Sequence, residues 1–436
     1  MVDNLRVAIN AQLTPGGACG GVEQFVMGLV HALGCLQDGP EEYVVVCPYT
    51  HPDWLRTCMG ANQRIVRGPA PPQAWKDRLE PVKQLLGPMR RPAGEALRTL
   101  RRRRGQTVAF RPAVVPKSDG FFEGLGVNLV HFPFQQFARC ELPTIFNPHD
   151  LQHLHYPEFF TPEQMAVREA VYPTACRLAD AVAAESVHAR LDIIEKLGLA
   201  PDKVYAIHRG PPTEIINDCE LQETVDVREK FRLWESFVLY PAQTWQHKNH
   251  LRLLKAIRLV RDTYGIRLNL VCTGRQNDLW PVIETCVQEL ALDHQVRFLG
   301  FVSVQQLRSL YRAAQFMVFP SLFEGGGFPI LEAFKEGTPV ACSTATSLPE
   351  YGGDAALYFD PASEESMASA IYRLHLDTDL RADLKARGIE RIARFTWDHT
   401  ARVYRALYRS VARHTLAVDD AALLAEARYI SRVEHR

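Results

Sequence analysis

Two glutamates flank a run of three glycines in the sequence FEGGGFPILEA, which covers residues 323–333. Glu324 precedes the glycines and Glu332 follows them, eight positions after Glu324. A carboxylate accepts two hydrogen bonds at once, and it therefore grips a vicinal diol of a sugar well. We interpret the two glutamates as hydroxyl-binding groups, Glu324 for a hexose and Glu332 for a ribose, rather than as an acid and base pair.

The glycines between these carboxylates form a loop that is suited to binding an anion. Because Gly325, Gly326 and Gly327 lack side chains, their backbone N–H groups can approach a phosphate closely. Pro329 suits the first turn of a helix, and that helix directs its positive end toward the same place. A nucleotide diphosphate sugar carries two diols on either side of a diphosphate, and it matches this arrangement.

The elements that position these residues follow from hydrophobic patterning. Short runs rich in valine and isoleucine alternate with amphipathic segments, as in βα units around parallel sheets. The pattern predicts strands at 5–10, 43–48, 127–132, 143–147, 180–185, 203–207, 237–242, 268–274, 296–301, 316–321, 339–343 and 356–359. The strand that ends at Ser321 places the glycine loop at the carboxyl edge of its sheet, where open α/β sheets bind ligands.

The length of 436 residues exceeds what one hydrophobic core usually supports, so we expect two α/β domains. Two prolines within 209–220 mark the expected boundary between the two series of βα units. The predicted domains are an amino-terminal one at 1–210, with a basic insertion near 69–120, and a carboxyl-terminal one at 211–394. Residues 395–436 are expected to form helices that pack back toward the first domain.

The composition narrows the class of protein. With 47% hydrophobic and 23% charged residues and a formal net charge of zero, the chain resembles a globular protein and indicates no polyanionic partner such as nucleic acid. The ten cysteines include no CxxC pair, so we expect reduced core cysteines, with disulfides or zinc as the alternatives. We see no signal peptide and no apolar run near the roughly 20 residues that span a bilayer. A cytoplasmic protein that meets a membrane only peripherally is the expectation.

A basic segment interrupts the first half. Residues 69–111 contain eleven basic and three acidic residues, and Leu79, Val82, Leu85 and Leu86 follow helical spacing. The candidate partners of this segment are the anionic inner face of a membrane, an anionic acceptor and nucleic acid. The alternative is a solvated insertion without a partner.

Several segments, taken in order, resemble the retaining glycosyltransferases of family 4, the glycosyl transferases group 1, which have a GT-B fold. FEGGGFPILEA resembles their Glu-x7-Glu motif. The other matching segments are GGVEQFV (20–26), NPHDLQHLHYPEFF (147–160), ADAVAAES (179–186), YPAQTWQHKNH (240–250), VRFLGFVS (296–303) and FTWDHTARVY (395–404). The likeness covers nearly the full chain apart from about 69–120 and the tail after 415. It implies two Rossmann-like domains whose parallel sheets face an inter-domain cleft.

The resemblance also implies roles for individual residues. The implied catalytic residues are Glu324 at the donor hexose, His149 near its reacting carbon, and Lys248, which would neutralise the leaving diphosphate. The implied donor-binding residues are Gly20, Gly21, Gln243, Lys248, Phe301, Val302, Gly325, Gly326, Gly327, Phe328, Pro329, Ile330 and Glu332. No cofactor is implied, since the nucleotide sugar is a co-substrate.

The sequence departs from the family at Gln243, where members often carry an arginine. The Gln243 amide can donate a hydrogen bond to a phosphate but supplies no charge. The candidate cations beside Lys248 are Arg275 and Arg209. The alternative reading of Lys248 itself is a surface lysine near a helix start.

Two patterns resemble metal sites. His149 and His153 have an HxxxH spacing, and Asp377 and Asp379 form a DxD pair in LHLDTDLRADL. The histidines lack an evident partner cluster, and the DxD pair falls in a polar turn between two amphipathic helices, where it suits a helix cap. We therefore expect no metal requirement, and we expect Asp150 to cap a helix or fix its loop.

These observations together predict a metal-independent transferase that moves a hexose from GDP-mannose or a UDP-hexose to a hydroxyl acceptor, in the synthesis of a glycan, polysaccharide or glycolipid. The resemblance implies retention of the anomeric configuration. The alternatives are a sugar-nucleotide epimerase or phosphorylase of the same fold, and a nucleic-acid or membrane binding module that uses the basic segment. The sequence leaves the donor sugar and the acceptor open.

Overall fold

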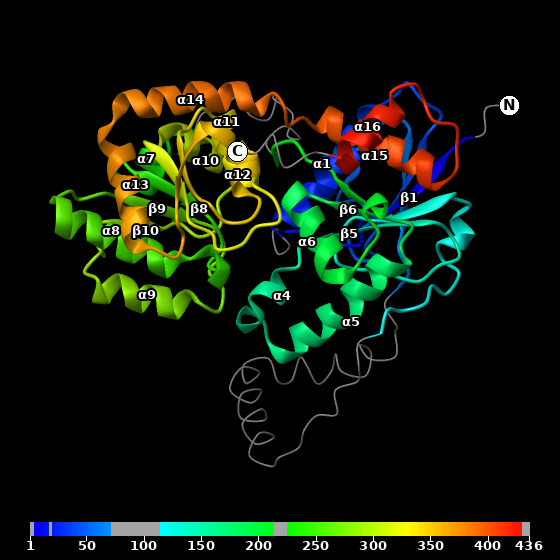
Figure 1. The fold of residues 1–436 in the computed structure, drawn as a ribbon, viewed down its shortest axis with the longest axis horizontal. Helices are drawn as coiled ribbons and strands as arrows, with labels where there is room; N and C mark the ends of the chain where they lie inside the picture. Colours follow the sequence, from blue (N-terminus) through cyan, green and yellow to red (C-terminus); the bar gives the residue numbers. More distant parts are fainter. Residues whose placement is uncertain (1–3, 17–19, 71–113, 213–224, 430–436) are drawn as a thin grey trace, which may run out of the picture.

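The structure is a computed structural model that describes residues 4–16, 20–70, 114–212 and 225–429. Its two parallel sheets lie side by side, each covered by helices (Figure 1). This architecture confirms the predicted α/β class with two Rossmann-like sheets. Most of the basic segment and part of the expected domain boundary lie outside the described residues.

The first sheet has seven strands in the order β3-β2-β1-β4-β5-β6-β7. The strands are β1 (Arg6–Asn10), β2 (Glu42–Cys47), β3 (Gln63–Arg67), β4 (Leu129–Phe132), β5 (Thr144–His149), β6 (Ala181–Ala184) and β7 (Val204–Ala206). The helices are α1 (Gly21–Cys35), α4 (Gln152–His155), α5 (Pro162–Leu178) and α6 (Val187–Leu197), with short 3-10 turns η1 (Arg56–Cys58), η4 (Glu123–Leu125), η5 (Pro157–Phe159) and η6 (Pro201–Lys203). One hydrophobic cluster fills each face of this sheet, so its central strands are rich in apolar residues.

The second sheet has six strands in the order β10-β9-β8-β11-β12-β13. The strands are β8 (Val238–Pro241), β9 (Leu270–Thr273), β10 (Val296–Phe298), β11 (Phe316–Phe319), β12 (Val340–Ser343) and β13 (Ala356–Phe359). The helices are α7 (Val227–Phe231), α8 (His250–Tyr264), α9 (Trp280–Glu289), α10 (Val304–Ala313), α11 (Phe328–Lys335), α12 (Leu348–Gly352), α13 (Glu364–Leu376) and α14 (Thr378–Ile392), with 3-10 turns η9 (Gln246–Lys248) and η10 (Gly353–Ala355). Every strand pairing within both sheets is parallel, so the ligand-binding edge of each sheet is its carboxyl edge.

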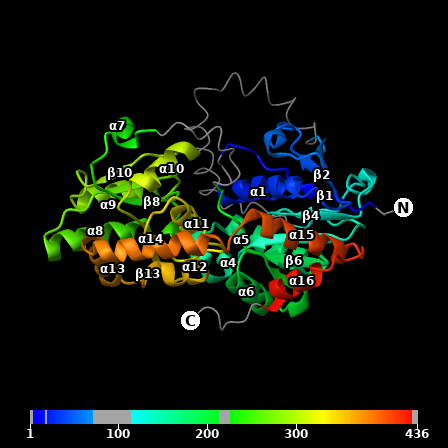
Figure 2. The ribbon, with the colours of Figure 1, turned by 90° about the horizontal axis from the view of Figure 1, so that it is seen from above.

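After α14 the chain returns to the first domain, where α15 (Trp397–Val411) and α16 (Asp420–Tyr429) lie beside the first sheet (Figure 2). Trp397 is buried in the same hydrophobic cluster as α1, and its indole N–H donates to the backbone oxygen of Pro211 at 3.0 Å. Arg409 on α15 pairs with the buried carboxylate of Glu41 at 2.7 Å. The last two helices therefore complete the core of the first domain. In the described residues no helix combines the length and apolarity that crossing a membrane requires.

Gly28→Ala is expected to destabilise the protein, although alanine favours helices more than glycine does. A Cβ at position 28 of α1 would overlap the indole ring of Trp397, and overpacking of this kind costs about 1–3 kcal/mol. Thermal unfolding of the variant measures the effect. The control is Gly124→Ala, because a Cβ at position 124 meets no atom of the described residues within 4 Å. Equal melting temperatures for the two variants would contradict close packing of α15 against α1.

Candidate active site

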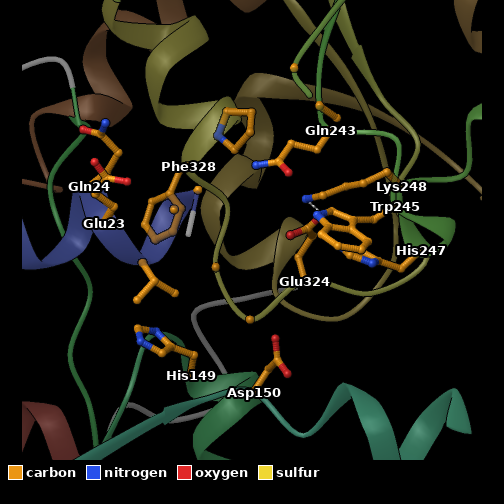
Figure 3. A pocket seen from close by; sticks show the side chains of 18 of the residues that line it. Glu23, Gln24, His149, Asp150, Gln243, Trp245, His247, Lys248, Glu324 and Phe328 are labelled. Atoms are coloured by element: carbon orange, nitrogen blue, oxygen red, sulfur yellow. Dashed lines mark hydrogen bonds and ion pairs between the residues drawn. The ribbon is translucent and has the colours of Figure 1, made fainter. Parts of the chain in front are cut away.

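A cavity of about 890 Å³ lies between the two sheets and is lined by residues from both domains (Figure 3). The expected site residues that line it are Gly20, Gly21, His149, Gln243, Lys248, Phe301, Val302, Glu324, Gly325, Gly326, Phe328, Pro329 and Glu332. Gly327 and Ile330 do not line the cavity: Ile330 is fully buried in the second core, and Gly327 packs against Tyr351. The fold therefore brings most of the predicted residues to one place, from segments far apart in the chain.

Lys248 and Glu324 form an ion pair inside the cavity, with Lys248 Nζ 2.6 Å from Glu324 Oε1 (Figure 3). Lys248 follows β8 and Glu324 follows β11, and these strands are neighbours in the sheet, so the two side chains meet at its carboxyl edge. The backbone of Glu324 is fixed, since its N–H donates to Thr346 Oγ1 and its carbonyl accepts from Thr346 and Ser347, each at 2.9 Å. The carboxylate is thus held at the mouth of the glycine loop.

Side chains added to the glycine loop would crowd their neighbours, most of all at Gly327. A Cβ at position 325 would lie 3.0 Å from the backbone oxygen of His149, and a Cβ at position 327 would lie 2.7 Å from atoms of the Tyr351 side chain. The loop leads directly into α11, which begins at Phe328 with a proline in its first turn. Free backbone N–H groups at this helix start can bind a phosphate.

Glu332 lies one turn into α11 and borders the cavity, where its Oε2 accepts from the Tyr311 hydroxyl at 3.0 Å. Burial raises the pKa of Glu332 to about 7, the Tyr311 hydrogen bond opposes this shift, and the nearby Glu336 charge adds to it. Because the pKa in the folded protein is above the ordinary carboxyl value, ionising Glu332 costs stability as the pH rises toward 7. Two sugar hydroxyls donating to the carboxylate would offset that cost.

Affinity for a nucleotide sugar is therefore expected to fall as Glu332 gains a proton. If the ribose binds only the ionised carboxylate, the affinity decreases about tenfold between pH 8 and pH 6. Titration calorimetry with the donor at these two pH values measures the change. Glu332→Gln binds the donor more weakly, with an affinity that no longer depends on pH in this range. The same pH dependence in both proteins would assign the titration to another group.

Gln243 and Arg275 reach from the second domain toward the first. The Gln243 side-chain oxygen accepts from Asn277 Nδ2 at 3.3 Å, and its Nε2 lies 3.0 Å from the position of a Cβ on Gly20. Arg275 Nη2 donates to the backbone oxygen of Gly16 at 2.6 Å. An amide and one cation of the second domain thus border the glycine turn before α1.

Three ionisable side chains are buried at the carboxyl edge of the first sheet: His149, Glu185 and Arg209. His149 was expected from the sequence, and Arg209 was one of two candidate cations. Glu185 was missed, although one signal exists, because a carboxylate directly follows the apolar strand residues of β6. Glu185 connects the other two residues, and all three line the cavity.

The first-domain side of the cavity carries amides, aromatic rings and a guanidinium that sequence reasoning did not identify. The amides and rings are Gln24, Gln135, Gln152, Phe159, Phe160, Gln164 and Tyr172, and the guanidinium is that of Arg168. The Arg168 guanidinium lies 4.6 Å from the centre of the Phe160 ring and donates to the Tyr172 hydroxyl at 2.9 Å. From the opposite domain, the half-exposed Trp245 borders the same space (Figure 3). Neutral amides and ring faces suit sugar hydroxyls and sugar C–H faces.

The residues of the two patterns that resembled metal sites have structural roles or packing contacts in the fold. His149 ends β5, whereas His153 is buried with its ring edge-on to Tyr172. The Asp377 side chain caps α14 by accepting from the backbone N–H of Leu380 at 2.8 Å. Within the described ranges, no three histidine, cysteine, aspartate or glutamate residues gather as a metal site. Asp150 Oδ1 accepts from the Gln152 N–H at 3.0 Å and so fixes the loop before α4.

Direct hydrogen bonds join the glycine loop and α12 of the second domain to the first domain. Ser186 Oγ donates to the backbone oxygen of Gly325 at 2.8 Å. The Glu350 carboxylate, on α12, accepts from the backbone N–H groups of Val187 at 2.7 Å and His188 at 3.2 Å, which begin α6. A side chain of one domain thus occupies the helix start of the other.

Solved structures with a similar fold define the class of protein first. Sucrose-phosphate synthase from Thermosynechococcus elongatus aligns with a TM-score of 0.64 and 21% identity over 94% of this chain and 99% of that one. The glycosyltransferase WaaG of lipopolysaccharide biosynthesis aligns with a TM-score of 0.56 and 13% identity over 93% of this chain and 98% of its own. The fold is therefore GT-B, as expected from the resemblance.

Sequence comparisons then define the family. Residues 222–391 match the family described as glycosyl transferases group 1. O-antigen chain mannosyltransferase B of Escherichia coli is 30% identical over 256 residues, which are 58% of this chain and 66% of that protein. O-antigen chain mannosyltransferase RfbU of Salmonella typhimurium is 29% identical over 45% of this chain and 52% of its own length. The chain belongs to the glycosyl transferases group 1, and its matches span about half to two thirds of these relatives.

Proposed function

We propose that the protein is a glycosyltransferase that moves a hexose from a nucleotide diphosphate sugar to a hydroxyl group of a growing polysaccharide. The observation that carries this proposal is the inter-domain cavity in which Glu324 and Glu332 flank the glycine loop, with Lys248 beside them. Glu332 is suited to the ribose diol, the α11 helix start to the diphosphate, and Glu324 to the hexose. The amides and aromatic rings of the first-domain side are suited to a carbohydrate acceptor.

The names of the relatives guide the choice of donors to test. Two of them are named as O-antigen chain mannosyltransferases, which supports GDP-mannose as the first donor to test and a polysaccharide as the product. A neighbouring structure, Anabaena HepE, was solved with UDP and glucose and aligns with a TM-score of 0.62 and 16% identity, so it informs the fold alone. UDP-hexoses, the other donors that the sequence leaves open, are the second donors to test.

The transfer that we propose keeps the anomeric configuration. The bond between the anomeric carbon and the donor phosphate oxygen breaks while the acceptor oxygen bonds to the same face of that carbon. The acceptor proton passes to the departing phosphate oxygen, so the reaction needs no protein base and, in this proposal, no metal. The protein supplies orientation of the two substrates and positive charge at the leaving diphosphate, from Lys248 and the α11 helix start.

A screen of nucleotide sugars tests the proposal. GDP-mannose or one UDP-hexose is expected to raise the melting temperature of the protein and to be hydrolysed slowly to the nucleoside diphosphate. EDTA in the assay tests the proposed metal independence. If no nucleotide sugar stabilises the protein or is turned over, the proposal is wrong.

A further inference from the structure

His149, Glu185 and Arg209 meet because β5, β6 and β7 are neighbours in the first sheet and each residue ends or follows one of these strands. Their exposed fractions are 5%, 4% and 3%, so all three ionisable groups are removed from water. A buried charge is costly unless another charge or hydrogen bond compensates it. The charge state of each member therefore depends on the other two.

Both ring nitrogens of His149 face oxygen acceptors. Its Nε2 lies 3.0 Å from the backbone oxygen of Pro133, and a carbonyl oxygen can only accept, so this nitrogen carries a proton. Its Nδ1 contacts Glu185 Oε1. The backbone of His149 has a φ of 67°, in the left-handed region, and a register shift in β5 precedes it, so the ring orientation is set by an irregular strand end.

Glu185 is paired with a cation, and this pair indicates that its carboxyl group is ionised. Arg209 Nη2 lies 3.1 Å from Glu185 Oε2, the oxygen that His149 does not contact. Burial alone would raise the pKa of Glu185, but the charges of Arg209 and His149 outweigh burial and hold that pKa below the ordinary value. An ionised Glu185 accepts from Nδ1 of His149, and the imidazole then carries two protons.

Other ionisable groups around the cluster agree with this assignment. His131, beneath His149, is kept neutral by burial, which lowers its pKa to about 4. The Tyr351 hydroxyl donates to the Glu185 backbone oxygen at 2.6 Å. Burial raises the pKa values of Tyr351 and Tyr404 above the ordinary tyrosine value, so both hydroxyls stay uncharged. Asp150 adds an acidic group near His149, and burial raises the pKa of its carboxyl.

Arg209 connects the cluster to the residues that begin α11 and α1. Its guanidinium lies over the ring of Phe328, the first residue of α11, and its Nη1 donates to the backbone oxygen of Gly21 at 3.3 Å. The cluster therefore contacts both helix starts that border the cavity, α1 and α11.

We propose that Glu185 is a positioning residue that keeps His149 doubly protonated at the floor of the cavity. This inference rests on the proposed function and extends it. With two cations and one anion, the cluster carries a net charge of +1, which favours the anionic donor and its leaving group. A doubly protonated His149 cannot take the acceptor proton, which agrees with the proposed transfer of that proton to the departing phosphate oxygen.

Nuclear magnetic resonance of histidine-labelled full-length protein tests the charge state without any substrate. The ring ¹⁵N shifts of His149, assigned with His149→Gln, are expected to be those of an imidazolium at pH 8. In Glu185→Gln they are expected to be those of a neutral ring. The matched control is Glu41→Gln, which also removes the charge of a buried glutamate paired with an arginine but lies by α15, in the first-domain core.

Turnover provides the second readout. Glu185→Gln is expected to hydrolyse the nucleotide sugar about tenfold more slowly at pH 8 and to recover as the pH falls and His149 regains its proton. Glu41→Gln should lose comparable thermal stability but show no such pH dependence. If Glu185→Gln does not fold, Glu185→Gln combined with Arg209→Gln removes both charges of the pair and allows the same measurements.

Specific results would overturn this inference. A neutral His149 ring in the wild type at pH 7, or an unchanged His149 charge in Glu185→Gln, would show that Glu185 does not hold the second proton. If His149 is neutral in Glu185→Gln and the turnover of this variant equals that of the wild type, the charge of His149 has no role in the reaction. If the shifts are as expected but no nucleotide sugar is turned over, the charge assignment stands and the proposed function fails.

Discussion

Lys248→Met is expected to lower kcat by about 10²–10³, because in the proposed reaction it removes a positive charge from the place where the leaving diphosphate gains negative charge. The effect falls on turnover more than on donor affinity, since the attraction grows as the glycosidic bond breaks. The loss also leaves Glu324, its partner at 2.6 Å, as an uncompensated carboxylate in the cavity. Repulsion between this carboxylate and the phosphate adds to the loss.

Steady-state kinetics of donor hydrolysis measure this loss, with Lys255→Met as the matched control. Lys255 lies on α8 of the same domain and pairs with Glu364 at 3.1 Å in a half-exposed ion pair. The control should keep wild-type kcat, because exposed ion pairs contribute little. A value of kcat within threefold of wild type for Lys248→Met would contradict the assignment of Lys248 to the leaving group.

Glu332→Ala is expected to raise the donor KM about 10-fold to 100-fold with a much smaller change in kcat. Hydrogen bonds to a charged group contribute about 1.5–3 kcal/mol, and in the proposed site the ribose is bound equally in the ground state and the transition state. Both nucleoside diphosphate and nucleoside should bind more weakly, because the contact is to the sugar.

The control for this variant is Glu284→Ala, which truncates an exposed glutamate on α9 of the same domain. Titration calorimetry with the nucleoside diphosphate compares the two proteins directly. If Glu332→Ala lowers kcat but binds the nucleoside normally, Glu332 contacts the reacting part of the donor instead of the ribose.

The sequence predicts the central strands well because they are buried on both faces. Runs such as YVVVC and FMVF have no polar residue to interrupt them, and all twelve expected strands occur with shifts of a few residues at their ends. The edge strand β3, with the sequence QRIVR, was missed. Its position at the edge of the sheet allows charged and amide side chains, so its pattern resembles that of a loop.

The sequence predicts which site residues lie at the ends of strands, but it does not predict which of their side chains contact one another. Glu324 and Lys248 could be placed at the carboxyl edge from the sequence, because each follows a recognisable strand. The contact of Glu185 with His149 and Arg209 depends on the strand order and on the left-handed backbone of His149, which no local pattern encodes. In the same way, Ile330 was expected at the donor but faces the core, because its side of α11 turns away from the cavity.

The carboxylate of Glu350 holds the second domain against the start of α6 in the first domain. It accepts the N–H groups of Val187 and His188 at the start of α6, and capping interactions of this kind contribute about 0.5–2 kcal/mol. Drawing the domains apart strips α6 of this cap and breaks the Ser186 bond to the glycine loop in the same motion. If the domains separate for donor entry, α6 keeps the cap of its own domain, the Ser186 Oγ that accepts from the Ala189 N–H at 3.0 Å, so each opening weakens the start of α6 without uncapping it.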